Sequence, residues 1–115
     1  MAIAVNSTKE ALATAYTGLG AYISLHTADP GSTGANEVSG GSPAYARKVT
    51  TWTAGTADGV VSGSQVTLDA PAGTYTYIGV WSAATGGTFI DKCAIASTVL
   101  SGQGQVLITP TVTVS

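Results

Sequence analysis

The chain opens on apolar positions that recur with the period of an α-helix. Residues at i, i+3, i+4 and i+7 fall on one helical face, and these are Leu12, Ala15, Tyr16 and Leu19. Ser7 and Glu10 precede them at capping-box spacing, in which a hydroxyl and a carboxylate each satisfy a free backbone N–H. Gly18 and Gly20 follow as stop signals. The pattern predicts one short N-terminal helix.

From residue 21 onward the apolar period becomes two. Residues 21–26 alternate so that Ile23 and Leu25 share one face and His26 lies on the other, less buried face. A loop from Asp29 to Ser42 follows, and residues 45–53 predict a second strand. Further turns are expected at residues 58–59 and 62–63, then a strand around residues 66–68, then a break at 69–73. These elements predict a chain of short antiparallel strands.

The clearest hairpin joins the runs 75–82 and 88–94 across Thr85-Gly86-Gly87, where glycine supplies positive φ. The final stretch, residues 105–115, predicts a strand or strand pair in which Pro110 marks an edge, a bulge or a change of sheet. Short strands with turn signals between them indicate an antiparallel β-sandwich or small barrel with one short N-terminal helix. We expect residues 1–115 to form a single β-rich domain.

Composition narrows the possible functions. Only 9% of the residues are charged and the net charge is −2, so the basic stripe that nucleic-acid binding requires is absent. No apolar run approaches the roughly 20 residues of a membrane span, and the start MAIAVNSTKE lacks the basic region of a signal peptide. We therefore expect a soluble protein, made in the cytoplasm, with neither nucleic acid nor membrane as partner. Its low surface charge favours association with neighbouring proteins.

Candidate catalytic chemistry is sparse. His26 is the only histidine, and no Gly-x-Ser-x-Gly elbow supplies a nucleophile for it, so it is interpreted as a structural or contact residue. Cys93 is the only cysteine and lies in an alternating strand, so we expect a small core residue or an interior thiol. The sequence predicts no catalytic residues, and the chain is not expected to be an enzyme.

The loop 29–42 offers oxygen atoms that a calcium ion could use. Asp29, Asn36 and Glu37 are candidates, but they lack EF-hand spacing. A turn with Pro30 and Gly31 at its centre explains the start of the loop better. We predict no metal and no cofactor.

Two further features suggest contacts. Arg47 and Lys48 are adjacent, so on a strand they point to opposite faces, and Arg47 is expected to clamp a loop carboxylate, Glu37 or Asp29, through its bidentate fork. Trp52 and Trp81 are more plausibly core residues than a sugar-stacking platform. The predicted contact loop is therefore defined by Asp29, Asn36, Glu37 and Arg47.

The segment YISLHTADPGSTGANEVSGGSPAYARKVTTW resembles a family of small tailed-bacteriophage virion proteins. The shared pattern runs from Leu-His-Thr-x-Asp-Pro-Gly through Asn-Glu-Val-Ser-Gly-Gly to Tyr-Ala-Arg. It is matched at Leu25, His26, Thr27, Asp29, Pro30, Gly31, Gly34, Asn36, Glu37, Val38, Ser39, Gly40, Gly41, Tyr45, Ala46 and Arg47. The later stretch YIGVWSAATGGTFI is similar to the hairpin of that family, so the resemblance spans Tyr22 to Ile90. Ser42-Pro43-Ala44 departs from the pattern, because relatives pass almost directly from Gly-Gly to Tyr-Ala-Arg.

Members of this family are usually labelled tail-fibre or minor tail proteins, and some similar small proteins decorate capsids. The resemblance implies a non-enzymatic structural component of a tailed-phage virion that acts through symmetric protein–protein contacts. We expect a homo-oligomer, for which a trimer is one candidate symmetry. It is expected to lie in the virion and to contact other capsid or tail proteins. The alternative is a host-surface adhesion or carbohydrate-binding module whose partner is a host glycan.

Overall fold

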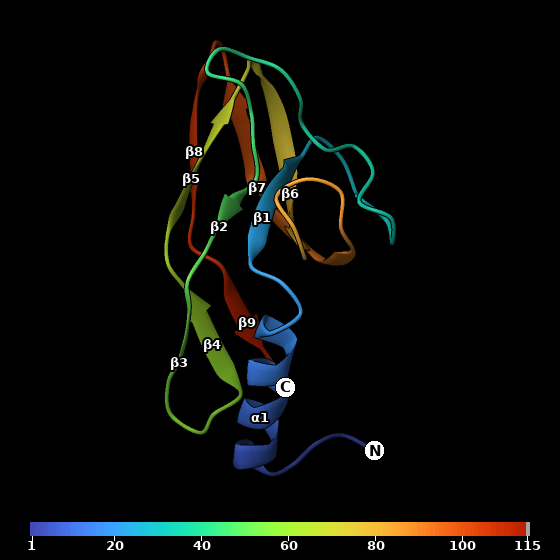
Figure 1. Ribbon diagram of the computed structural model, residues 1–115, viewed down its shortest axis with the longest axis vertical. Helices are drawn as coiled ribbons and strands as arrows, with labels where there is room; N and C mark the ends of the chain where they lie inside the picture. The colour runs from blue at the N-terminus through green and yellow to red at the C-terminus, as the bar shows by residue number, and fades with distance from the viewer. Residues whose placement is uncertain (115) are drawn as a thin grey trace.

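The computed structural model describes residues 1–114 of the chain. Within them one helix and nine strands follow one another in this order: α1 (Asn6–Thr17), β1 (Tyr22–His26), β2 (Lys48–Val49), β3 (Trp52–Ala54), β4 (Val60–Gly63), β5 (Val66–Ala70), β6 (Gly73–Trp81), β7 (Phe89–Leu100), β8 (Gly104–Ile108) and β9 (Thr111–Thr113). The molecule is elongated, with extents of 46 × 25 × 24 Å (Figure 1). The predicted fold class is confirmed: the protein is mainly β, with antiparallel sheets and one helix.

The largest sheet has the strand order β2-β1-β6-β7 and is antiparallel throughout. In its central strand pair, β1 and β6, Ile23 lies opposite Val80 and Leu25 lies opposite Ile78. These four branched side chains therefore share one face of the sheet. The strands β6 and β7 form the predicted hairpin, and β7 runs on to Leu100. This sheet is the platform on which the candidate site is built.

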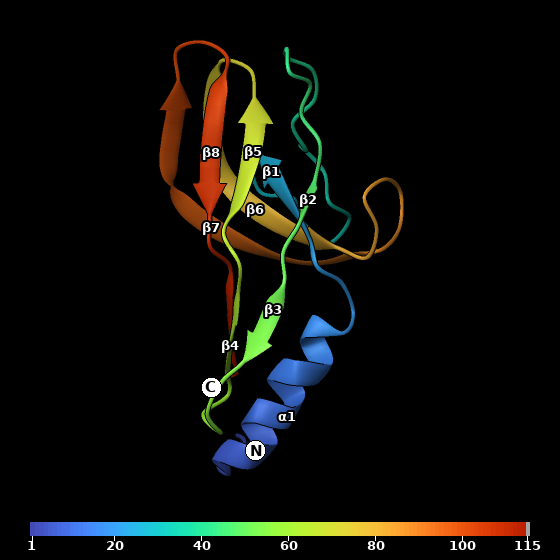
Figure 2. The ribbon, with the colours of Figure 1, turned by 60° about the vertical axis from the view of Figure 1, so that its left-hand side comes forward.

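The apolar face of this sheet packs against the two-stranded sheet β5-β8 (Figure 2). Their shared core consists of Ile23, Leu25, Val38, Val66, Leu68, Ala70, Tyr75, Ile78, Val80 and Val106. Alternation along β5 explains the pattern, because Val66, Leu68 and Ala70 are buried while Thr67 is exposed. The upper part of the molecule is thus two packed layers.

At the other end of the molecule, α1 covers the three-stranded sheet β3-β4-β9 (Figure 1). The predicted capping box is wrong, because the helix starts after Val5 without a side-chain cap and Glu10 instead accepts a hydrogen bond from the Gly59 N–H. The predicted apolar face is also wrong: Ala13 is the buried residue, whereas Leu12 and Leu19 are exposed. Packing of α1 against β4 explains why the buried position, Ala13, holds a small side chain. Among residues 1–114, no helix combines the length and apolar character needed to cross a bilayer.

Of three smaller strand predictions, two change and one is confirmed. The run 45–53 splits into β2 and β3, which belong to different sheets, and its ordered pairing starts only at Lys48, after the Ser42-Pro43-Ala44 departure. The turn expected at residues 62–63 is wrong, because β4 extends through Gly63. Pro110 does mark a change of sheet: β8 pairs with β5, and β9 pairs with β4.

Candidate functional site

The contact loop returns alongside the strand that it leaves. The Thr27 N–H donates to the Asn36 carbonyl, the Val38 N–H donates to the Leu25 carbonyl, and a β-bridge joins His26 to Glu37. Side chains alternate along this short extended piece, so Val38 enters the core while Glu37 faces the opposite side of the sheet. The loop is therefore an added part of the sheet and not a free connection.

The second face of the large sheet is buried beneath this loop. Ser24 and His26 point to that face, and both are fully buried, so the prediction of a less buried position for His26 is wrong. Gly79 pairs with Ser24 on the same face, where an added Cβ would lie 2.5 Å from the Ser24 Oγ and 2.9 Å from the His26 Nε2. The loop supplies a cover that strand alternation alone does not reveal.

A chain of hydrogen bonds satisfies the buried polar groups. The Trp81 Nε1–H donates to the Ser24 Oγ at 3.0 Å, and the Ser24 Oγ lies 2.7 Å from the His26 Nε2. The His26 Nδ1 lies 2.8 Å from the Ala35 carbonyl, which can only accept, so we assign the proton to Nδ1 and the acceptor role to Nε2. His26 is thus a neutral structural residue that ties β1 to the loop.

Glu37 and Arg47 form the predicted clamp. The Arg47 Nε and Nη2 each lie 2.9 Å from one oxygen of the Glu37 carboxylate, the two-pronged geometry that lysine cannot supply. The Tyr45 hydroxyl donates to the same carboxylate at 2.8 Å and accepts from the Leu25 N–H at 3.1 Å. Burial alone would raise the pKa of Glu37, but the hydrogen bonds from Arg47 and Tyr45 outweigh it and hold that pKa below its usual value.

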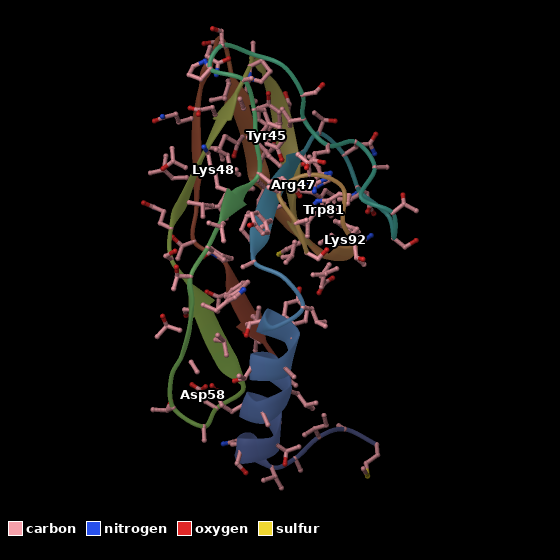
Figure 3. All side chains as sticks on the ribbon, viewed as in Figure 1. Tyr45, Arg47, Lys48, Asp58, Trp81 and Lys92 are labelled. Carbon is pink, nitrogen blue, oxygen red and sulfur yellow. The ribbon has the colours of Figure 1, made fainter. Side chains whose placement is uncertain are left out.

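The same guanidinium also fastens the β6–β7 hairpin turn. Its Nη1 donates to the carbonyls of Ala83 at 3.0 Å and Gly86 at 2.9 Å. Its Cζ stacks 3.6 Å from the Trp81 ring centroid, and only 9% of the Arg47 side chain is exposed. Figure 3 shows Arg47 beside Trp81 and Lys48 on the other side of the chain, in line with the opposite directions predicted for these two adjacent residues. Arg47 therefore joins the loop, the sheet and the hairpin turn.

Asp29 and Asn36 have structural roles at the loop's base. The Asp29 Oδ1 accepts from the Gly31 N–H at 2.8 Å and pairs with the Lys92 ammonium at 2.6 Å, while the Asn36 Nδ2 donates to the Asp29 carbonyl. The hydrogen bond from Lys92 holds the pKa of Asp29 below its ordinary value. Among residues 1–114, no group of three or more acidic, histidine or cysteine side chains is placed to hold a metal ion.

The sequence did not identify Ser24, Tyr45 or Lys92 as part of this network. Tyr45 stands two residues before Arg47, and Ser24 two before His26, so period-two spacing was the signal that could have found them. Cys93 was wrongly predicted to be interior: it is exposed, because it lies on the edge strand β7. Trp81 is buried as predicted, with 8% exposure, which removes it from any sugar-stacking platform.

The neutral state of His26 predicts a pH-dependent stability. Burial lowers its pKa below the ordinary 6.5, against the opposing effects of the Ala35 hydrogen bond and the Glu37 charge. As pH falls below 6.5 the unfolded chain binds the proton first, so stability is complete above that pH and declines below it, by at most about 1.4 kcal/mol per pH unit. Urea unfolding measured from pH 7.5 to pH ~5 gives this slope. The range lies above the pH at which carboxylates usually titrate, so the slope reports mainly on His26.

The matched control for this prediction is His26→Gln, which keeps a polar side chain but does not titrate. It should be less stable at pH 7.5 yet lose little further stability on acidification. Equal slopes in the two proteins would show that His26 is not the group responsible.

Comparison of the sequence with protein-family models finds a match over nearly the whole chain. The family model described as "Podophage GP4 fiber I protein gp80" matches residues 7–115. No match was found among curated proteins. The matched description is of a phage fibre protein, the kind of virion component to which the resemblance of residues 22–90 pointed. Because the match spans nearly the whole chain, the protein belongs to the Podophage GP4 fiber I protein gp80 family.

Proposed function

We propose that this protein is a non-enzymatic structural component of a tailed-phage virion that works through protein–protein contacts within a symmetric homo-oligomer. Membership of a phage fibre family supports a structural role. The observation that carries the finer proposal is the Arg47 network, which fixes the contact loop and the β6–β7 hairpin turn as one surface. We call residues 27–44 and 82–88 the loop face.

The loop face has the chemistry of a contact surface. Its exposed positions include Ser32, Thr33, Ala84 and Thr85, which are small and uncharged. Its charged side chains are neutralised internally, since Glu37 pairs with Arg47 and Asp29 pairs with Lys92. A partner can approach such a surface without desolvating unpaired charges, and its fixed backbone loses little entropy on binding.

The alternative, a carbohydrate-binding module, is not favoured by any feature of the site. It would use exposed aromatic faces, but the Trp81 ring is covered by Arg47 and Phe89. Trp52 is half-buried and donates its Nε1–H to the Gly20 carbonyl. The surface therefore suits a protein neighbour better than a sugar.

Phage carrying charge substitutions on the loop face test this proposal. Ser32→Lys together with Thr85→Lys places two unpaired cations on exposed positions, and Ala57→Lys is the matched control at the opposite end of the molecule. Quantitative mass spectrometry of purified particles should find the protein in wild-type and control virions. The double variant should fall by at least about tenfold, since one uncompensated charge at an interface costs more than the ~1.4 kcal/mol that a factor of ten requires. Equal incorporation of all three proteins would contradict the role of the loop face.

A further inference from the structure

An open apolar groove lies on a different part of the molecule from the loop face. It has a volume of about 540 Å³ and runs between β7 and the segment 107–114. Ile78 and Val80 of the large sheet form part of its lining, together with Cys93, Ile95 and Leu107. Leu107 is 56% exposed, so apolar surface remains uncovered here.

The groove exists because the two packed layers do not close on this side. Within residues 1–114, β7 pairs only with β6, and β8 pairs only with β5. The chain then leaves the β5-β8 sheet at Pro110, which cannot donate a backbone hydrogen bond. Both strands beside the groove are thus sheet edges, and a long edge strand is a template for adding another strand.

The charge distribution restricts what can occupy the groove. Neither residues 93–100 nor residues 107–114 include a charged side chain. At one end, Asp91 already accepts a hydrogen bond from the Tyr16 hydroxyl at 3.0 Å, and Lys92 is paired with Asp29. A charged occupant would lose its hydration without gaining a partner. The matching occupant is an extended, uncharged, apolar segment.

Residues 1–5, which we call the arm, are such a segment. The side chains of Met-Ala-Ile-Ala-Val are all uncharged, and Val5 has extended backbone angles. The one charge of the arm, the α-ammonium group of Met1, lies at its outer end, where it can stay in water. Met1 is fully exposed and Val5 is 59% exposed, so most of the surface of these two apolar side chains is uncovered in their own chain. Figure 1 shows the arm leaving α1 in a direction away from the sheets.

We propose that the arm of one copy binds in the groove of a second copy and extends its sheet along β7. The contact would be heterologous, joining two different surfaces, so it closes into a ring when the rotation between copies permits. This inference deepens the proposed homo-oligomer and therefore rests on the proposed function. It adds a contact between copies at the groove to the contacts proposed for the loop face.

Cys93 gives a direct test, because it is the only cysteine and lies in the groove. Tagged Ala4→Cys, Cys93→Ser protein is mixed with untagged wild-type protein and treated with a short bismaleimide. The matched control replaces Ala4→Cys with Ala11→Cys, an exposed alanine on α1. A bound arm raises the local thiol concentration, so the Ala4 mixture should give at least about tenfold more tagged–untagged heterodimer than the control.

Equal heterodimer yields in the two mixtures would overturn the proposal. An intramolecular link in an Ala4→Cys chain that retains Cys93 would also overturn it, because the arm would then occupy its own groove. Leu107→Asp should reduce the heterodimer yield without unfolding the protein, since Leu107 is already more than half exposed. This experiment uses purified protein alone. Its failure would leave the detection of the protein in virions, and hence the proposed function, separately testable.

Discussion

Replacing Arg47 with alanine is expected to lower the free energy of unfolding by about 3 kcal/mol, because breaking a largely buried ion pair leaves one charge uncompensated. The Glu37 side chain is 21% exposed, so water can solvate the remaining carboxylate only in part. The substitution also removes the hydrogen bonds to Ala83 and Gly86 and the stacking on Trp81. Urea unfolding at pH 7 measures the change.

Two variants separate the geometry of Arg47 from its charge. Arg47→Lys keeps the charge but loses the fork, so it should recover only part of the lost stability. Lys48→Ala removes the neighbouring cation, which is exposed, and should stay within about 0.5 kcal/mol of wild type. A similar loss for Arg47→Ala and Lys48→Ala would mean that the clamp does not stabilise the protein.

The second large effect is expected at Gly34, a loop residue that is buried like a core residue. Its φ is +79°, and an added Cβ would lie 2.3 Å from the Trp81 ring and 3.0 Å from Phe89. Gly34→Ala should therefore cost about 3 kcal/mol or more, from left-handed strain and overpacking together. Unfolding followed by tryptophan fluorescence measures the loss of stability and reports on the surroundings of Trp81.

Gly31→Ala is the matched control in the same loop. Gly31 has a similar φ of +64°, but nothing lies within 4 Å of its added Cβ. This variant should lose only about 1 kcal/mol, the cost of the backbone strain alone. If the two variants were equally destabilised, the close contact between the loop and Trp81 would be ruled out.

Local patterns predicted the parts of this structure that local physics determines. The β6–β7 hairpin follows from two β-rich runs around Gly86-Gly87, and the turn after Asp29 shows the positive φ of Gly31. The Glu37–Arg47 pair was predicted because arginine matches a carboxylate bidentately, and only a few carboxylates lay within reach in the sequence.

Tertiary contacts explain what the sequence did not predict. His26 is buried because the loop folds back over the second face of the sheet, and alternation along one strand contains no information about that cover. The Glu10 carboxylate accepts a hydrogen bond from the Gly59 N–H, 49 residues away, and does not cap the start of its own helix. Cys93 lies in a stretch that alternates like a core strand. It is nevertheless exposed, because β7 is an edge strand that does not pair with β8.

The central claim, that this chain is a structural part of a phage particle, is tested most directly by mass spectrometry of wild-type virions purified through a density gradient. We expect the protein to co-purify with the capsid proteins at a constant ratio across the particle peak. Its absence from that peak, with the protein found only in the soluble fraction of the lysate, would contradict the claim.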